Sequence, residues 1–133
     1  MKTLKILFID DDEIERLKFE RIIKQINISS HVTSAYDGED ALNKLNHSTI
    51  DLIILDLNMP KMNGTELLHS LKMNESLKYI PIVILTSSTF HVEIKYCFEI
   101  GIAGYFIKPL RYENYKKLIE KIISYWGQNK FIE

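Results

Sequence analysis

Polar side chains of a few definite types follow short apolar segments along this 133-residue sequence. Four segments end in this way: residues 6–9 in Asp10, Asp11 and Asp12, residues 52–55 in Asp56, residues 82–85 in Thr86, and residues 105–107 in Lys108 and Pro109. Carboxylates suit a hard metal ion, while an ammonium and a hydroxyl group suit the oxygens of a phosphoryl group. The combination favours transfer of a phosphoryl group assisted by a metal ion.

The carboxylates pose an electrostatic problem. If residues 6–9 and 52–55 form neighbouring strands, Asp10, Asp11 and Asp56 lie close together and repel one another. Two like charges about 4 Å apart cost roughly 4 kcal/mol at an effective dielectric constant near 20, so the carboxylates either take up protons or hold a cation. Carboxylates, a backbone carbonyl and water form the coordination that Mg²⁺ prefers. We therefore predict a Mg²⁺ site, with Mn²⁺ as the alternative ion.

A phosphoryl group needs an acceptor and a pocket for its outer oxygens. Lys108 supplies a second positive charge, and Thr86 supplies a hydroxyl donor. Asp56 is the carboxylate best placed to attack the phosphorus and form an aspartyl phosphate. Positioning and charge neutralisation carry such a transfer, with the phosphoryl group coming from a separate donor.

These residues require a scaffold of parallel strands. The predicted strands are residues 6–9, 31–35, 52–57, 82–85 and 105–107. Helical spacing of apolar residues predicts helices within residues 14–26, 41–45, 67–71, 92–100 and 115–126. Alternation of strands and helices indicates a mostly parallel sheet, and strands that are apolar nearly throughout are typical of a sheet covered on both faces. Ligands bind such sheets at the carboxyl ends of the strands, where these polar residues fall.

Length and composition restrict the class of protein. A chain of 133 residues, 46% of them hydrophobic, can form one compact domain, with a core over about residues 4–126 and a short C-terminal tail. A net charge of -1 creates no strong field for nucleic acid or an anionic membrane, and no apolar run approaches the roughly 18 residues of a membrane span. We expect a cytoplasmic protein with no DNA or membrane partner.

Four stretches, taken together and in order, resemble the receiver domain of bacterial response regulators. They are residues 6–13 (ILFIDDDE), 51–64 (DLIILDLNMPKMNG), 81–86 (PIVILT) and 104–109 (GYFIKP). The resemblance spans nearly the whole chain and is greatest to stand-alone receivers of the chemotaxis type. It implies a single receiver domain over residues 1–133. The implied fold is flavodoxin-like: a doubly wound, three-layer α/β/α arrangement of five parallel strands, in the order 2-1-3-4-5, and five helices.

The resemblance also implies a role for the residues around the acceptor. By position, Asp56 matches the phosphoacceptor, and Asp10 and Asp11 match the acidic pair that binds the metal with it. Asn58 matches the residue that lends its backbone carbonyl to the metal. The donor that the resemblance implies is a phosphohistidine on a sensor histidine kinase or a histidine phosphotransfer protein.

The remaining matches concern the switch. Thr86 matches the switch hydroxyl and Tyr105 the rotating aromatic residue, while Lys108 matches the phosphate-binding lysine before a cis-proline, here Pro109. Ser87 departs from the pattern, because a smaller residue is commoner there, and this leaves the rate of spontaneous dephosphorylation open. The segment 72–79 is longer than in the most compact receivers, as in phytochrome-linked regulators.

The expected function is a phosphorylation-dependent switch. A phosphoryl group adds about two negative charges at the edge of the sheet, and we expect Thr86 and Tyr105 to move in response and reshape the face of the fourth helix, fifth strand and fifth helix. Output then passes to a partner protein, through a homodimer, or by onward phosphotransfer. We do not expect an enzyme, beyond gain and loss of the chain's own phosphoryl group. Four aromatic residues suggest docking on the last helix: Tyr112, Tyr115, Tyr125 and Trp126.

Other interpretations remain open. A phosphohydrolase with an aspartyl nucleophile usually needs a second acid two residues later, where this chain has Asn58. A flavin carrier of this fold would have a loop rich in Ser, Thr and Gly in place of the three aspartates. A degenerate receiver that acts only as a scaffold would not need the acidic set. Residues 10–12 also fit a simple helix cap, whereas an unpaired Asp56 in an apolar strand would cost several kcal/mol.

Overall fold

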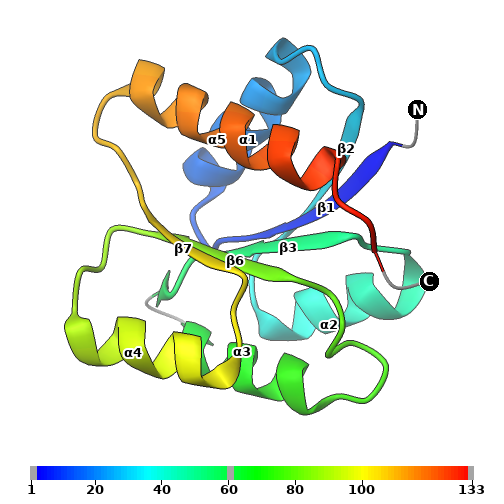
Figure 1. Ribbon diagram of the computed structural model, residues 1–133, viewed down its shortest axis with the longest axis vertical. Coiled ribbons are helices and arrows are strands. Elements are labelled where there is room, and N and C mark those ends of the chain that lie inside the picture. The colour runs from blue at the N-terminus through cyan, green and yellow to red at the C-terminus, as the bar shows by residue number, and fades with distance from the viewer. Residues whose placement is uncertain (1–2, 60–61, 132–133) are drawn as a thin grey trace.

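The computed structural model describes residues 3–59 and 62–131. Its centre is a sheet of five parallel strands in the order β2-β1-β3-β6-β7 (Figure 1). The strands are β1 (Leu4–Ile9), β2 (Ser30–Ala35), β3 (Leu52–Leu55), β6 (Ile82–Thr86) and β7 (Gly104–Ile107). Among the described residues, β1, β3 and β6 are buried almost throughout, as their apolar sequences require.

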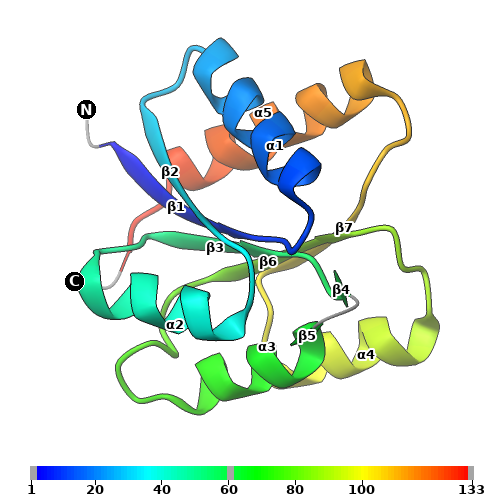
Figure 2. The ribbon, with the colours of Figure 1, turned by 180° about the vertical axis from the view of Figure 1, so that it is seen from behind.

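Helices cover both faces of the sheet. On one face lie α1 (Glu13–Gln25) and α5 (Tyr112–Gly127). On the other lie α2 (Gly38–His47), α3 (Gly64–Met73) and α4 (His91–Ile100), as Figures 1 and 2 show from opposite sides. Each face has its own apolar core, one built around Phe8 and Phe19, whose rings stack 4.1 Å apart, and the other around Leu68 and Ile84. The predicted three-layer α/β/α fold is therefore confirmed.

The strand order also follows the prediction once the strands of this sheet alone are counted along the chain, because it then becomes 2-1-3-4-5. The structure adds a short antiparallel pair, β4 (Asn58–Met59) and β5 (Met62–Asn63), which the sequence did not indicate. The third strand ends at Leu55 and not at Leu57 as predicted.

Local capping explains where the helices next to the site begin. The Asp12 carboxylate accepts a hydrogen bond from the Ile14 backbone N–H at 2.9 Å, so α1 starts directly after the aspartate cluster. Asn63 caps α3 in the same way through the N–H groups of Thr65 and Glu66. No helix in the described ranges has the length and apolar character needed to cross a membrane.

Candidate functional site

The register of the two central strands places Asp10 beside Asp56. Ile9 of β1 pairs with Leu55 of β3, and the Asp56 backbone N–H donates to the Ile9 carbonyl at 3.1 Å. The two aspartates that follow these strands therefore emerge side by side at the carboxyl edge of the sheet. Both are buried, with side chains only 2% and 9% exposed.

Lys108 joins the two aspartates from the far edge of the sheet. The Lys108 backbone N–H donates to the Thr86 carbonyl at 2.8 Å, which holds the end of β7 beside β6. Its ammonium group donates to Asp56 Oδ2 at 3.1 Å and to Asp10 Oδ2 at 3.2 Å. The side chain is 15% exposed, so this ion-paired group lies largely out of water, where charge-assisted hydrogen bonds are strong.

The protonation equilibria of the site reflect this crowding. Burial, aided by the negative charge of Asp56, raises the pKa of Asp10 to about 6, although the Asp12 backbone N–H and Lys108 act to lower it. Burial acts to lower the pKa of Lys108, but Asp56 and Asp10 outweigh it and leave that pKa above its ordinary value. The site therefore stabilises a cation and has more negative charge than Lys108 alone can balance.

A pocket of about 600 Å³ opens over this cluster. Its charged lining consists of five carboxylates and two ammonium groups: Asp10, Asp11, Asp12, Glu15, Asp56, Lys18 and Lys108. In the described part of the chain, no three carboxylate, imidazole or thiol groups converge as a ready metal cluster. The residues nevertheless fit a hard divalent ion, because the pocket has an excess of carboxylate oxygens and Mg²⁺ needs only one or two of them with carbonyl and water ligands.

Asn58 lies next to Asp56 in the pocket. Its backbone N–H donates to Asp56 Oδ1 at 3.0 Å, and its side-chain amide donates to Ser87 Oγ at 3.4 Å. The first bond fixes the rotation of the Asp56 carboxylate, since Lys108 holds the other oxygen. Asn58 therefore lines the pocket as expected, at the position where a phosphohydrolase would need a second acid.

The remaining predicted residues form a second group behind the acids. Thr86 is completely buried at the end of β6, and its hydroxyl oxygen accepts from the Ser88 backbone N–H at 3.4 Å. The hydroxyl of Tyr105 donates to the Ser88 carbonyl at 3.0 Å. Thr86 and Tyr105 thus both bond the backbone of Ser88 in the loop between β6 and α4, Thr86 at its N–H and Tyr105 at its carbonyl.

The expectation for Pro109 was wrong. Among the described residues no peptide bond is cis, and the bond between Lys108 and Pro109 is trans. The trans form is the intrinsically preferred one before proline, by about 0.5–1 kcal/mol. Lys108 reaches both aspartates in this geometry, with its backbone held by Thr86.

Among the residues of the pocket, Glu15 was missed in the sequence and Tyr115 was misread. Glu15, on the first turn of α1, has one carboxylate oxygen 3.7 Å from the Lys108 ammonium. Tyr115 was expected to add to a docking surface on α5, but it is 1% exposed and lines the pocket. The helical positions of these residues were visible in the sequence. Which side of α1 and α5 faces the site depends on how both helices pack on the sheet.

Gly64 brings the start of α3 against the backbone that directly follows β3. A Cβ atom there would lie 2.7 Å from Leu57 Cα and 3.1 Å from the Asp56 carbonyl oxygen. We expect Gly64→Ala to lower the free energy of unfolding by about 1–3 kcal/mol, because backbone atoms have to shift. Urea denaturation followed by circular dichroism measures the change.

Gly127, at the end of α5, provides the control. A Cβ atom there would meet only Ile28 Cγ2, at 3.8 Å, so Gly127→Ala should be neutral or slightly stabilising. Equal stabilities of the Gly64→Ala variant and the wild type would show that the close approach of α3 is not required.

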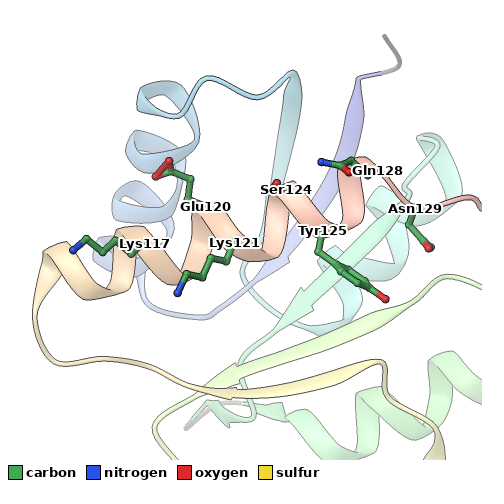
Figure 3. Close-up of a pocket in the computed structure, with 7 residues that line it drawn as sticks. All are labelled: Lys117, Glu120, Lys121, Ser124, Tyr125, Gln128 and Asn129. Carbon is green, nitrogen blue, oxygen red and sulfur yellow. The ribbon is translucent and has the colours of Figure 1, made fainter.

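A second hollow, of about 770 Å³, lies away from this chemistry along α5 (Figure 3). Its lining comes from α5 and the residues directly after it, including Lys117, Lys121 and Tyr125. Tyr125 is 66% exposed. The hollow contains none of the residues predicted for the site. The predicted acids and Lys108 line the pocket at Asp56 instead.

The fold and this pocket define a doubly wound α/β protein with an anionic, lysine-bridged site at the carboxyl edge of its sheet. The chain belongs to the response regulator receiver domain family, which it matches over residues 6–120. As a receiver domain of two-component systems, it takes part in phosphorylation-dependent signalling. Domains of this family bind a divalent metal ion and interact with histidine kinases or phosphotransfer proteins.

Individual relatives agree with this assignment. The chemotaxis protein CheY of Pseudomonas aeruginosa is 31% identical over 121 residues, which cover 91% of this chain and 97% of that protein. The crystal structure of the phosphorylated cyanobacterial phytochrome response regulator RcpA has a TM-score of 0.90 at 24% identity, covering 99% of this chain and 100% of that one. The Mn²⁺-bound form of the response regulator Rcp1 has a TM-score of 0.85 at 27% identity, covering 98% and 99%. The similarity to the chemotaxis type is as expected, and the likeness to RcpA concerns the fold.

Proposed function

We propose that Asp56 accepts a phosphoryl group from a phosphohistidine of a sensor histidine kinase or histidine phosphotransfer protein, in the presence of Mg²⁺. The observation that carries the proposal is the Lys108 ammonium bridging Asp56 and Asp10. Two buried carboxylates share one monovalent cation in a pocket that has excess acid. Such a site is prepared for added positive charge and, through Lys108, for an anion.

Each residue contributes a separate part of the transfer. The carboxylates of Asp10, Asp11 and Asp56 and the backbone carbonyl of Asn58 would hold Mg²⁺, with Mn²⁺ as the alternative ion. Bound Mg²⁺ supplies neutralisation of the phosphoryl oxygens. An Asp56 oxygen attacks the phosphorus as the bond from phosphorus to the imidazole nitrogen breaks, and the electron pair of that bond remains on the nitrogen. Lys108 stays beside Asp56 and pairs with the new charge.

Thr86 and Tyr105 would then transmit the change. The Thr86 hydroxyl turns toward a phosphate oxygen and gives up its contact with the Ser88 N–H, which at 3.4 Å is long for a hydrogen bond. Tyr105 exchanges its bond to the Ser88 carbonyl for an inward position as the loop moves. This biases two existing states of the face formed by α4, β7 and α5.

That face is the proposed output surface. Exposed apolar side chains occur on all three of its elements, among them Tyr96 on α4, Ile107 on β7 and Tyr125 on α5. A partner protein would dock there, or a second copy of the chain would form a homodimer. We propose no DNA or membrane partner, a cytoplasmic location, and no enzymatic activity beyond the chain's own phosphorylation and dephosphorylation.

Incubation with a small phosphodonor tests the proposal. Intact-mass spectrometry should show the addition of one phosphoryl group in the presence of Mg²⁺ and almost none in excess EDTA. Phosphodonor consumption should stop near one equivalent on the timescale of labelling. Steady turnover of an external phosphate ester would instead identify a phosphohydrolase, and labelling unaffected by EDTA would exclude the proposed metal.

A further inference from the structure

Lys108 faces a third carboxylate as well as the two that it bonds. Its ammonium nitrogen is 3.1 Å from Asp56 Oδ2 and 3.2 Å from Asp10 Oδ2. The third carboxylate is that of Glu15 on α1, whose Oε2 lies 3.7 Å from the same nitrogen. The last distance is too long for a hydrogen bond but within reach of a small side-chain rotation. Glu15 therefore offers the ammonium an alternative partner.

The two oxygens of Glu15 are in different situations. Oε1 accepts from the Lys18 ammonium at 3.1 Å, and Lys18 Nζ itself lies 4.7 Å from the centre of the buried Tyr115 ring. Oε2 is buried and, in the described ranges, has no hydrogen-bond partner. Leaving a buried carboxylate oxygen without a partner is costly. Lys18 holds the Glu15 side chain through Oε1, and Oε2 remains free to accept a hydrogen bond from Lys108.

The open acceptor matters because Lys108 and a divalent cation require the same carboxylates. An ammonium group and a divalent cation that share the same buried carboxylates would repel each other strongly, because little water lies between them to screen the charges. Lys108 therefore has to leave Asp10 when that carboxylate binds a divalent cation. Among the acids lining the pocket, Glu15 is the third one within 4 Å of the ammonium.

We propose that Glu15 is a positioning residue that receives the Lys108 ammonium when a divalent cation occupies the site. The inference rests on the proposed metal site of the previous subsection. When Lys108 loses its hydrogen bond to Asp10, it forms one to Glu15 Oε2, so the bond gained offsets the bond lost. Lys108 then stays at the pocket wall, close to Asp56, and remains available to an incoming phosphoryl group.

Mg²⁺ titration calorimetry on four variants tests this role without measuring phosphorylation. Glu15→Gln should weaken Mg²⁺ binding about five- to tenfold. The same change should have less than about a twofold effect when Lys108→Met is already present, because Glu15 acts through Lys108. Glu20→Gln removes the same charge from α1 at a half-buried glutamate that bonds Ser34 on β2, and it should leave Mg²⁺ affinity unchanged.

The outcomes separate this inference from the proposed function. Equal weakening by Glu15→Gln with and without Lys108 would show a general field effect and overturn the inference, as would an unchanged affinity of the single variant. In both cases the wild type still binds Mg²⁺ and the proposed function stands. A wild type without measurable Mg²⁺ binding would overturn the proposed function, and the inference with it.

Discussion

Asp56→Asn is expected to abolish phosphorylation by a small phosphodonor. The amide oxygen is a far weaker nucleophile than the carboxylate, and the substitution also removes one of the two charges that hold Lys108. The size and shape of the side chain are conserved, so the fold should remain intact. Labelling of the variant should fall at least about a hundredfold, which intact-mass spectrometry over a time course measures.

Asp51→Asn is the matched control. Asp51 and Asp56 flank the same strand, β3, and both carboxylates are buried. Asp51 accepts the Lys5 backbone N–H at 2.9 Å at the opposite end of the sheet, where no lysine bridge or acidic pocket exists among the described residues. Its variant should be phosphorylated at nearly the wild-type rate. Comparable loss of labelling in both variants would mean that damage to the sheet, and not the acceptor, explains the result.

Lys108→Met should cause the largest loss of stability among substitutions at the site. Removing the ammonium leaves Asp10 and Asp56 buried, adjacent and without a counter-charge. Deletion of one partner of a buried ion pair typically costs about 3–5 kcal/mol, and partial exposure of the lysine reduces the expected loss to about 2–3 kcal/mol. Urea denaturation at neutral pH in EDTA measures it.

Added Mg²⁺ should restore more stability to Lys108→Met than to the wild type, because it no longer competes with the ammonium. Lys72→Met serves as the control. Lys72 is also half-buried, and burial lowers its pKa. Within residues 3–59 and 62–131 its ammonium donates only to the Lys78 carbonyl, at 3.2 Å. That variant should lose no more than about 1 kcal/mol. A Lys108→Met protein as stable as the wild type in EDTA would contradict the assigned role of the bridge.

Much of the fold follows from local sequence because the buried strands are apolar throughout. Residues 52–55 and 82–85 read as strands, and both lie in the centre of the sheet as expected. Boundaries were less accurate where polar residues decide them: α2 extends over Gly38–His47 because Asp37 caps it, although apolar spacing alone indicated only residues 41–45. The β4–β5 pair is too short to leave a pattern.

The convergence of Asp10, Asp56 and Lys108 could be predicted because it depends on one general feature, the common edge at which parallel strands end. Glu15 and Tyr115 could not be placed in the same way. Their positions depend on how α1 and α5 rotate against the sheet, which is set by packing over the whole face. The cis isomer expected before Pro109 came from the family resemblance alone, whereas the bond is in the trans form that X–Pro bonds intrinsically prefer.

The most direct test of the central claim is to locate the phosphoryl group on the wild-type chain. Borohydride reduction after phosphorylation converts an aspartyl phosphate to homoserine, and peptide mass spectrometry then identifies the position. The account predicts homoserine at residue 56 when Mg²⁺ is present. Homoserine at residue 10 or 11, or an unmodified chain under these conditions, would contradict it.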